Sequence, residues 1–183
     1  MTTNRLLTFT NDSPLRTVLL NAQSQPVYRI YSPDKVFIYG STTTIIRCSG
    51  MYPNQPEEEV GRINWHRHHR SQMVFGGRTF EVNSFLQKTG FVGRGNRIWL
   101  GPDGQEYMWN VDNSPTTLIL NDGSGTVVAC FTRGSLRLPW MKQKRPACLQ
   151  IRPNGFHMVD LILLTFVYAE QKKREHDDDD GGA

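Results

Sequence analysis

The sequence predicts an all-β domain with one C-terminal helix, in which an antiparallel barrel of about twelve strands surrounds a buried hydrophobic helix. Short stretches rich in β-branched and aromatic residues recur about every 8–12 residues and are separated by turn residues, as in sandwiches and barrels. One late stretch, Val159 to Tyr168, is apolar nearly all round, so we expect a helix that is covered on every side. No alternation of strands with amphipathic helices occurs, which argues against a Rossmann fold.

The predicted strands follow one another from the N-terminus to residue 131. Turn residues such as Gly76-Gly77, Gly101 to Gly104 and Asn121 to Gly125 separate several of them. The residues from Ser49 to Glu59 are expected to form an exposed loop. The predicted strands are Leu6–Phe9, Thr17–Leu20, Val27–Tyr31, Lys35–Tyr39, Thr43–Cys48, Val60–His66, Gln72–Phe75, Thr79–Val82, Arg97–Leu100, Glu106–Trp109, Thr117–Leu120 and Val127–Phe131.

The only convincing helix is predicted over Phe156 to Arg174. Its apolar part is too short and too polar for a membrane span, which needs about 20 mostly apolar residues. A barrel wrapped around this helix is the first interpretation, and a sandwich with the helix across one face is the alternative. We expect Asp160 and His157, three residues apart at the start of the helix, to share a face and to act as a polar plug at the barrel mouth, with contact to a ligand as the alternative.

The charge of the chain is unevenly distributed. The full chain of 183 residues has a net charge of +4, but residues 1–169 hold 18 Lys and Arg against 11 Asp and Glu, a net of +7. We therefore expect an N-terminal extension over residues 1–25 that contributes strands, a basic domain over 26–175 and an acidic disordered tail over 176–183. An excess of basic residues favours anionic partners such as inositol head groups, anionic lipid surfaces or RNA.

The composition also excludes several classes of protein. Cys48, Cys130 and Cys148 are three thiols without a C-x-x-C spacing, so neither a disulfide framework nor a cysteine zinc site is expected. The first residues lack the apolar core of a signal peptide, and no Gly-x-Ser-x-Gly nucleophile motif is present. The expected location is cytoplasmic, with peripheral membrane contact as an extension of the basic charge.

Three groups of residues resemble a known family. They are Ile98 to Gly104 followed by Glu106 to Trp109, Leu120 to Gly123 followed by Val127 to Phe131, and Val159 to Tyr168 followed by Lys172 to Arg174. Together they resemble a fungal, mainly basidiomycete, family of unknown function whose domains are similar to the tubby C-terminal, scramblase and LURP-one-related superfamily. The resemblance covers about residues 26–175. It implies a closed barrel of about twelve strands around a hydrophobic helix, and distant relatives that bind phosphoinositide head groups or are linked to membranes.

The first candidate site is a basic stretch in the middle of the chain. Its Gly-rich part, Gly90 to Gly95, would let backbone N–H groups approach a phosphate, although the Gly-Lys-Ser/Thr ending of a P-loop is missing. The alternative is a solvated basic face without a ligand. The candidate anion-binding residues are Arg62, Arg67, Arg70, Arg78, Lys88, Arg94 and Arg97.

The second candidate site is the string Trp65 to Arg70, which contains His66, His68 and His69. Imidazoles are common ligands of transition metals, and in a strand His66 and His68 would point to the same face. The flanking Arg67 and Arg70 oppose a bound cation, so a basic strand end without a metal is the stronger interpretation.

The sequence therefore predicts a non-enzymatic intracellular module that binds anionic lipid head groups or another phosphate-bearing ligand, with no cofactor. A metal-dependent hydrolase or nuclease built on the histidines is the first alternative. A protein-interaction module, with the acidic tail as adaptor or autoinhibitor, is the second.

Overall fold

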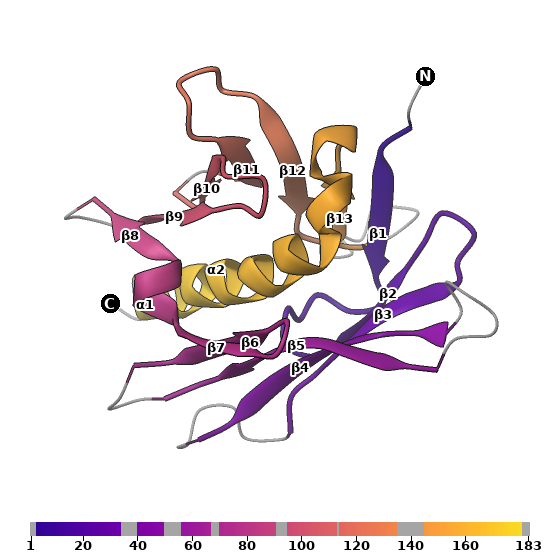
Figure 1. Ribbon diagram of the computed structural model, residues 1–183. Helices are drawn as coiled ribbons and strands as arrows, with labels where there is room; N and C mark the ends of the chain where they lie inside the picture. The colour runs from indigo at the N-terminus through magenta and orange to yellow at the C-terminus, as the bar shows by residue number, and fades with distance from the viewer. Residues whose placement is uncertain are drawn as a thin grey trace.

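A computed structural model describes residues 3–33, 40–49, 56–66, 70–90, 95–112, 114–134 and 145–180 of the chain. It contains one antiparallel sheet and one long C-terminal helix (Figure 1). The strands are β1 (Arg5–Phe9), β2 (Thr17–Leu20), β3 (Pro26–Tyr31), β4 (Thr42–Arg47), β5 (Glu58–Asn64), β6 (Gln72–Phe75), β7 (Arg78–Glu81), β8 (Gln87–Thr89), β9 (Asn96–Leu100), β10 (Glu106–Asn110), β11 (Thr116–Leu120), β12 (Val127–Thr132) and β13 (Cys148–Ile151). The helical elements are α1 (Val82–Phe85), the 3₁₀ helix η2 (Pro153–Met158) and α2 (Val159–Asp180).

The thirteen strands form a single sheet in the order β7-β6-β5-β4-β3-β2-β1-β13-β12-β11-β10-β9-β8. Nearly all neighbours in this order are also neighbours in sequence, and the exception is β1, which pairs with both β2 and β13. This pairing joins the N-terminal strands to the strand before the helix. The N-terminal extension is thus an integral part of the sheet.

The two end strands of the sheet, β7 and β8, are consecutive in sequence and are connected by the short helix α1. In the part of the chain that the structure describes, β7 and β8 are not paired with each other. The antiparallel sheet with a C-terminal helix is confirmed, whereas closure of the barrel stays a prediction. We call this place, where α1 connects the two unpaired end strands, the seam.

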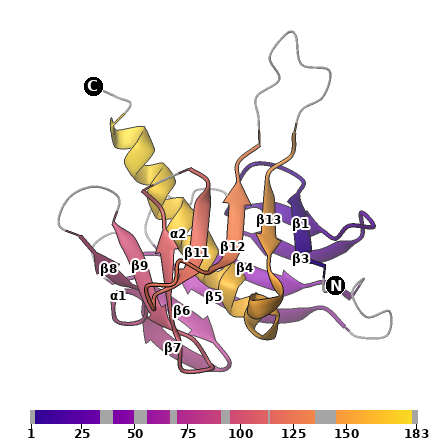
Figure 2. The same ribbon diagram turned by 90° about the horizontal axis from the view of Figure 1, so that it is seen from above.

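The helix α2 lies between the two halves of the sheet. Figures 1 and 2 show strands β3 to β7 on one side of α2 and β9 to β12 on the other. All side chains from Leu161 to Gln171 are buried, so no face of this part of the helix is exposed to solvent. A uniformly apolar stretch needs such cover on every side, as its sequence predicted.

An aromatic cluster anchors the middle of α2 to the sheet. The ring of Phe166 lies 4.6 Å from Phe131 of β12 and 5.9 Å from Phe9 of β1, measured between centroids. The buried indole Nε1 of Trp109 donates a 2.9 Å hydrogen bond to Thr165 Oγ1 of α2. Tilted rings add about 0.5–1.5 kcal/mol per pair beyond area burial, so this cluster fixes the helix in one position.

Two glycines allow the backbone of the sheet and of η2 to come close to neighbouring elements. A Cβ on Gly61 of β5 would lie 3.2 Å from Leu164 Cδ2 of α2, and one on Gly155 of η2 would lie 2.8 Å from Val128 Cγ1 of β12. A larger residue at either position would push helical and strand backbones apart. These contacts set the depth at which the helix lies in the sheet.

The structure corrects several predicted boundaries. The α-helix begins at Val159 after a 3₁₀ turn with Pro153 in its first turn, where proline's fixed φ is favourable. It continues to Asp180, so residues 176–180 are helical and not the start of a disordered tail. The exposed loop ends earlier than expected, because Glu58 and Glu59 already pair with β4. The predicted strand Lys35–Tyr39 lies outside the described residues.

Candidate functional site

A polar pocket lies at the N-terminal end of α2. Its volume is about 440 Å³, and three of its residues, Arg5, Tyr28 and Arg47, come from the strands β1, β3 and β4. Phe75 and Pro102 complete the strand side, and residues 156–161 of η2 and α2 form the helical side. The pocket therefore brings together both ends of the chain and falls in the size range of small-molecule sites.

Asp160, in the first turn of α2, connects the helix to the sheet inside this pocket. Its Oδ1 accepts a 2.7 Å hydrogen bond from the hydroxyl of Tyr28, and its Oδ2 forms an ion pair with Arg47. Burial and the Asp160 carboxylate raise the pKa of Tyr28 well above its usual value, so Tyr28 stays a neutral donor. Burial alone would lower the pKa of Arg47, but Asp160 and Tyr28 together outweigh it and the net shift is upward. The predicted polar plug at this end of the helix is thus built by Asp160 with partners that the sequence did not suggest.

Arg5 is the cation of this pocket that forms no ion pair with a carboxylate among the described residues. Its guanidinium carbon lies 5.1 Å from the centroid of the Phe156 ring, a cation–π distance. Arg47, by contrast, also forms a 2.6 Å ion pair with Glu58, whose side chain is 63% exposed. An exposed pair of this kind is worth only about 0–1 kcal/mol, so an anion in the pocket could replace Glu58 at little cost.

His157 also lines the polar pocket, but its partner is Asp103 and not Asp160. Its Nε2 is 3.3 Å from Asp103 Oδ2 in the turn between β9 and β10. The same carboxylate oxygen accepts a 2.7 Å hydrogen bond from the Tyr107 hydroxyl. Burial opposes ionisation of Asp103, but the hydrogen bonds from Tyr107 and from the turn backbone lower its pKa overall. His157 and Asp160 therefore line one pocket, as their spacing predicted, while binding different partners.

The predicted basic stretch does not converge on one site in the described part of the chain. Arg62 pairs with Glu59 at 3.4 Å, and Arg70 pairs with Glu81 at 2.8 Å. Arg97 is only 8% exposed and lies over the Tyr168 ring, so it contributes to the core and not to a surface patch.

Two further members of that stretch, Lys88 and Arg78, do not line the polar pocket. Lys88 is exposed on the end strand β8, and Arg78 of β7 lines a second, apolar pocket. Arg67 and Arg94 lie outside the described residues.

The histidine string is described only in part. His66 follows β5, and its backbone N–H donates a 3.2 Å hydrogen bond to Ser71 Oγ. His68 and His69 lie outside the described residues. Within the described ranges, no group of three His, Cys, Asp or Glu side chains is placed to hold a metal ion. The metal hypothesis stays a prediction.

The thiols show no sign of activation. Burial raises the pKa of Cys48, Cys130 and Cys148 above its ordinary value. Reactive cysteines need the opposite shift, because the thiolate is the nucleophile.

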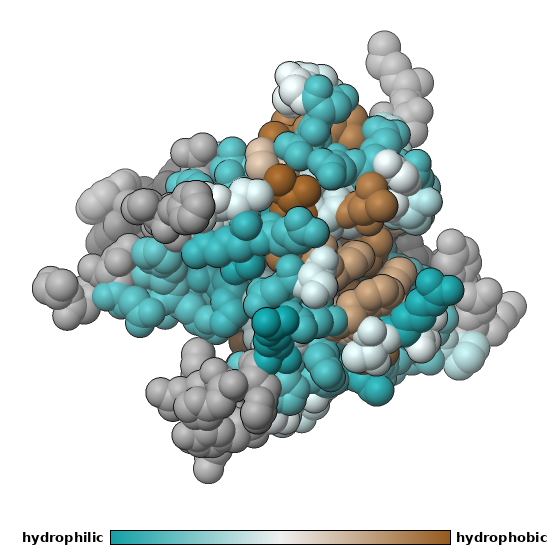
Figure 3. Space-filling view, turned by 60° about the vertical axis from the view of Figure 1, so that its left-hand side comes forward, coloured by the Kyte–Doolittle hydropathy of each residue, from teal (hydrophilic) through white to brown (hydrophobic). Residues whose placement is uncertain are grey.

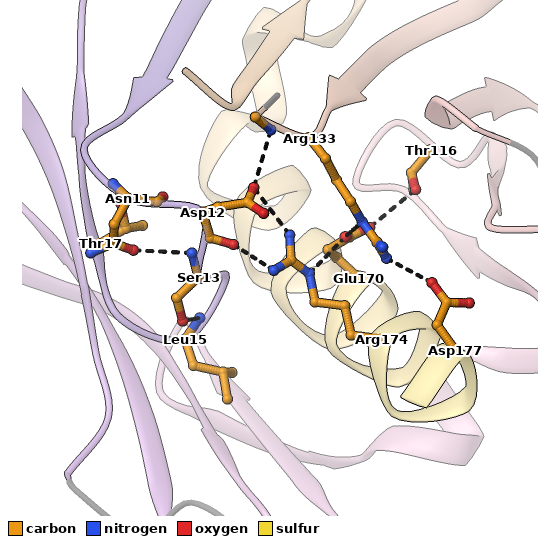
Figure 4. A network of polar contacts seen from close by, with 11 residues as sticks. Asn11, Asp12, Ser13, Leu15, Thr17, Thr116, Arg133, Glu170, Arg174 and Asp177 are labelled. Atoms are coloured by element: carbon orange, nitrogen blue, oxygen red, sulfur yellow. Dashed lines mark hydrogen bonds and ion pairs between the residues drawn. The ribbon is translucent and has the colours of Figure 1, made fainter. Parts of the chain in front are cut away.

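A second polar cluster lies at the far end of the buried part of α2 (Figure 4). Glu170 is fully buried, and its Oε1 is 2.8 Å from Arg133 Nε and 2.9 Å from Arg174 Nε. Its Oε2 accepts a 3.1 Å hydrogen bond from Thr116 Oγ1, so both carboxylate oxygens are satisfied.

The arginines of this cluster also bind further acceptors. Arg133 Nη2 lies 3.1 Å from Asp177 Oδ2, and Arg174 donates to the backbone oxygen and the carboxylate of Asp12. Burial alone would lower the pKa of Arg133, but Glu170 and Asp177 raise it overall. Asp12, Glu170 and Asp177 thus face Arg133 and Arg174, while Lys173 Nζ donates to Thr116 Oγ1. We call this the Glu170 network.

Little in the sequence could have identified either cluster. Tyr28 and Asp160 are 132 residues apart, and Arg174 and Asp12 are 162 apart. The one usable signal was a charged residue inside an apolar helix, which did identify Asp160. Glu170 carries the same signal at the end of the apolar stretch.

Among the described residues, no helix is both long and apolar enough to cross a membrane. The chain resembles a protein from Arabidopsis thaliana, AT5G01750, known from an X-ray structure, with 13% identity and a TM-score of 0.43 over 87% of this chain and 88% of that one. No curated protein matches the sequence. A family model, described as a family of unknown function (DUF6593), matches residues 12–175, and the chain belongs to that family.

Proposed function

We propose that this protein is a non-enzymatic binding module for a phosphate-bearing anion, and that the ligand binds in the polar pocket at the start of α2. The observation that carries the proposal is Arg5, a cation on the pocket wall without a carboxylate partner among the described residues. The tubby-like closed barrel and the relation to that superfamily belong to the same proposal, as does an intracellular location.

The pocket has the chemistry that a phosphate requires. Guanidinium groups bind phosphate through paired N–H donors, and Arg5 and Arg47 both line the pocket.

One carboxylate opposes the ligand. Asp160 lies in the pocket wall, but its charge is directed to Arg47 and Tyr28. Its repulsion is therefore largely offset, and the residues that line the pocket keep one net positive charge, Arg5 and Arg47 against Asp160. Glu58, which also pairs with Arg47, is not part of the lining.

The proposal is tested with a soluble and a membrane-bound form of the same chemistry. Inositol 1,4,5-trisphosphate is titrated calorimetrically at low salt, where electrostatic attraction is strongest, and vesicles with and without phosphatidylinositol 4,5-bisphosphate are sedimented with the protein. We expect binding in at least one arm. Binding in both identifies the phosphorylated head group as the ligand, and binding to vesicles alone identifies the lipid surface.

Arg5→Gln should weaken this binding about tenfold, the value of one lost charge-assisted contact. Arg29→Gln is the matched control, because Arg29 is also a strand arginine but lies half-exposed beside Glu57, with 45% of its side chain exposed. Absence of binding in both arms, or equal loss in the two variants, would overturn the proposal.

A further inference from the structure

A second, apolar pocket lies at the seam of the sheet, beside the polar pocket. Its volume is about 420 Å³. Its walls come from β6 and β7, from α1, from the β9–β10 turn and from the first turns of α2. The residues that line it are Met73, Phe75, Gly76, Arg78, Phe80, Phe85, Leu100, Gly101, Pro102, Leu161 and Leu164.

The apolar pocket lies beside the end strand β7, which in the described part of the chain is not paired with β8. Phe80 of β7 and Phe85 of α1 line it together with side chains of the neighbouring elements. The pocket reaches Leu161 and Leu164 of the buried helix, so it leads from the surface to the centre of the fold. Figure 3, which brings the α1 side of the molecule forward, shows hydrophobic surface surrounded by hydrophilic atoms.

The rim of this pocket carries the most exposed large hydrophobic residue of the described chain. Leu100, at the end of β9, is 60% exposed and takes an outward position in the alternation of that strand. Exposed apolar side chains at the mouth of an apolar pocket are typical of ligand sites.

The two pockets adjoin one another. Phe75, Pro102 and Leu161 line both of them. A ligand with an apolar part against Phe80 and Leu164 can therefore place a charged end toward Arg5 and Arg47. Arg78 is a further cation that lines the apolar pocket.

We infer that the two pockets form one site for a single-chain amphiphile, with an alkyl or acyl chain in the apolar pocket and a phosphate head group in the polar pocket. This inference rests on the proposed function and names its ligand class. Charge excludes a cationic amphiphile, since Arg5, Arg47 and Arg78 surround the site with Asp160 as the single carboxylate. The volume of the apolar pocket, about 420 Å³, favours a single chain over a pair of chains.

The test uses monoalkyl phosphates of increasing chain length, from methyl to decyl phosphate, titrated below their aggregation concentrations. Each methylene that leaves water contributes about 0.8 kcal/mol, so binding should tighten up to about fourfold per methylene and then level off when the pocket is full. Equal affinity of methyl and decyl phosphate would overturn the inference while leaving the proposed function intact.

A cationic amphiphile tests the preference for an anionic head group separately from the binding of the alkyl chain. Decyltrimethylammonium should bind at least tenfold more weakly than decyl phosphate. If it binds equally well, the head-group preference fails, and with it the proposed function. If neither probe binds, the inference fails as well.

Two variants locate the chain. Leu100→Trp places bulk at the pocket mouth and should weaken decyl phosphate about fivefold or more, without changing methyl phosphate. Tyr31→Trp is the control, because Tyr31 is another exposed large hydrophobic residue, 49% exposed, and it does not line either pocket. Equal effects of the two variants would contradict a chain site at the seam.

Discussion

The two ends of the buried stretch of α2 use similar side chains for different purposes. At the far end, Glu170 is fully buried and is matched by Arg133, Arg174 and Thr116. At the near end, Asp160 is only partly buried, and Arg5 lies beside an open pocket without a carboxylate partner among the described residues. The comparison shows two uses of charged side chains in this fold. Where they are enclosed and paired, as around Glu170, they stabilise the folded state. Where an unpaired cation lies beside a cavity, as Arg5 does, it is available to bind an anion.

The largest expected effect is on the Glu170 network. Glu170→Gln leaves two arginines without their shared carboxylate, and breaking a buried pair in this way costs about 3 kcal/mol of unfolding free energy. Urea unfolding measures the loss.

Glu59→Gln is the matched control, since Glu59 pairs with Arg62 on the surface with 44% of its side chain exposed. This variant should lose less than about 1 kcal/mol. Similar losses for the two variants would show that the enclosed network contributes no more than a surface pair.

The next effect concerns Tyr28 at the polar pocket. Its pKa is raised in the folded state by burial and Asp160, so above pH 10 the folded protein retains a proton that the unfolded chain releases. The free energy of unfolding should therefore fall as the pH rises above 10. In the wild-type protein this fall should be steeper than in Tyr28→Phe by about 1.4 kcal/mol per pH unit. Unfolding curves of both proteins between pH 9 and 11 provide the comparison, and parallel pH dependences would contradict the buried Tyr28–Asp160 contact.

A smaller loss is expected for Thr116→Val in the Glu170 network. The hydroxyl of Thr116 bonds to Glu170 and lies 3.0 Å from Lys173 Nζ. Valine keeps the shape and removes these bonds, so we expect about 1–2 kcal/mol less stability. Thr117→Val, one position along β11 on the other face, should be nearly neutral, and a neutral Thr116→Val would argue that Glu170 is satisfied without it.

The smallest stability effect is expected for Arg5→Gln. Its cation–π contact with Phe156 is worth about 0.5–1 kcal/mol, so unfolding free energy should change by no more than that while phosphate binding falls. If Arg5→Gln lowered the unfolding free energy by several kcal/mol, Arg5 would be a structural residue. The two ends of the buried stretch of α2 would then no longer differ in the role of their charged side chains.

The elements with strong local patterns could be predicted from the sequence, and those with weak patterns could not. The apolar stretch from Val159 to Tyr168 and the alternating strands were identified because periodicity reports burial directly. β8 is three residues long and entirely polar, and β13 follows Pro146 with only four residues, so neither has a readable period. The helix continues to Asp180 although four aspartates oppose its dipole, and the Asp177 contact with Arg133 contributes to holding that end.

The candidate site was less accessible to sequence reasoning. Basic residues close together in sequence, such as Arg62, Arg70 and Arg97, lie in different elements, and each finds its own partner. The residues that do meet, Arg5 and Arg47, come from separate strands and lie next to the start of α2. Their juxtaposition depends on the order of the sheet, which local patterns do not encode.

The most direct test of the difference between the two ends is an NMR titration of ¹⁵N-labelled protein with inositol 1,4,5-trisphosphate. The account predicts saturable shifts in the backbone amides of Arg5, Arg47 and residues 156–161, with the amides of Thr116, Arg133 and Arg174 unchanged. Shifts centred on Thr116, Arg133 and Arg174, or no shifts at low salt, would contradict it.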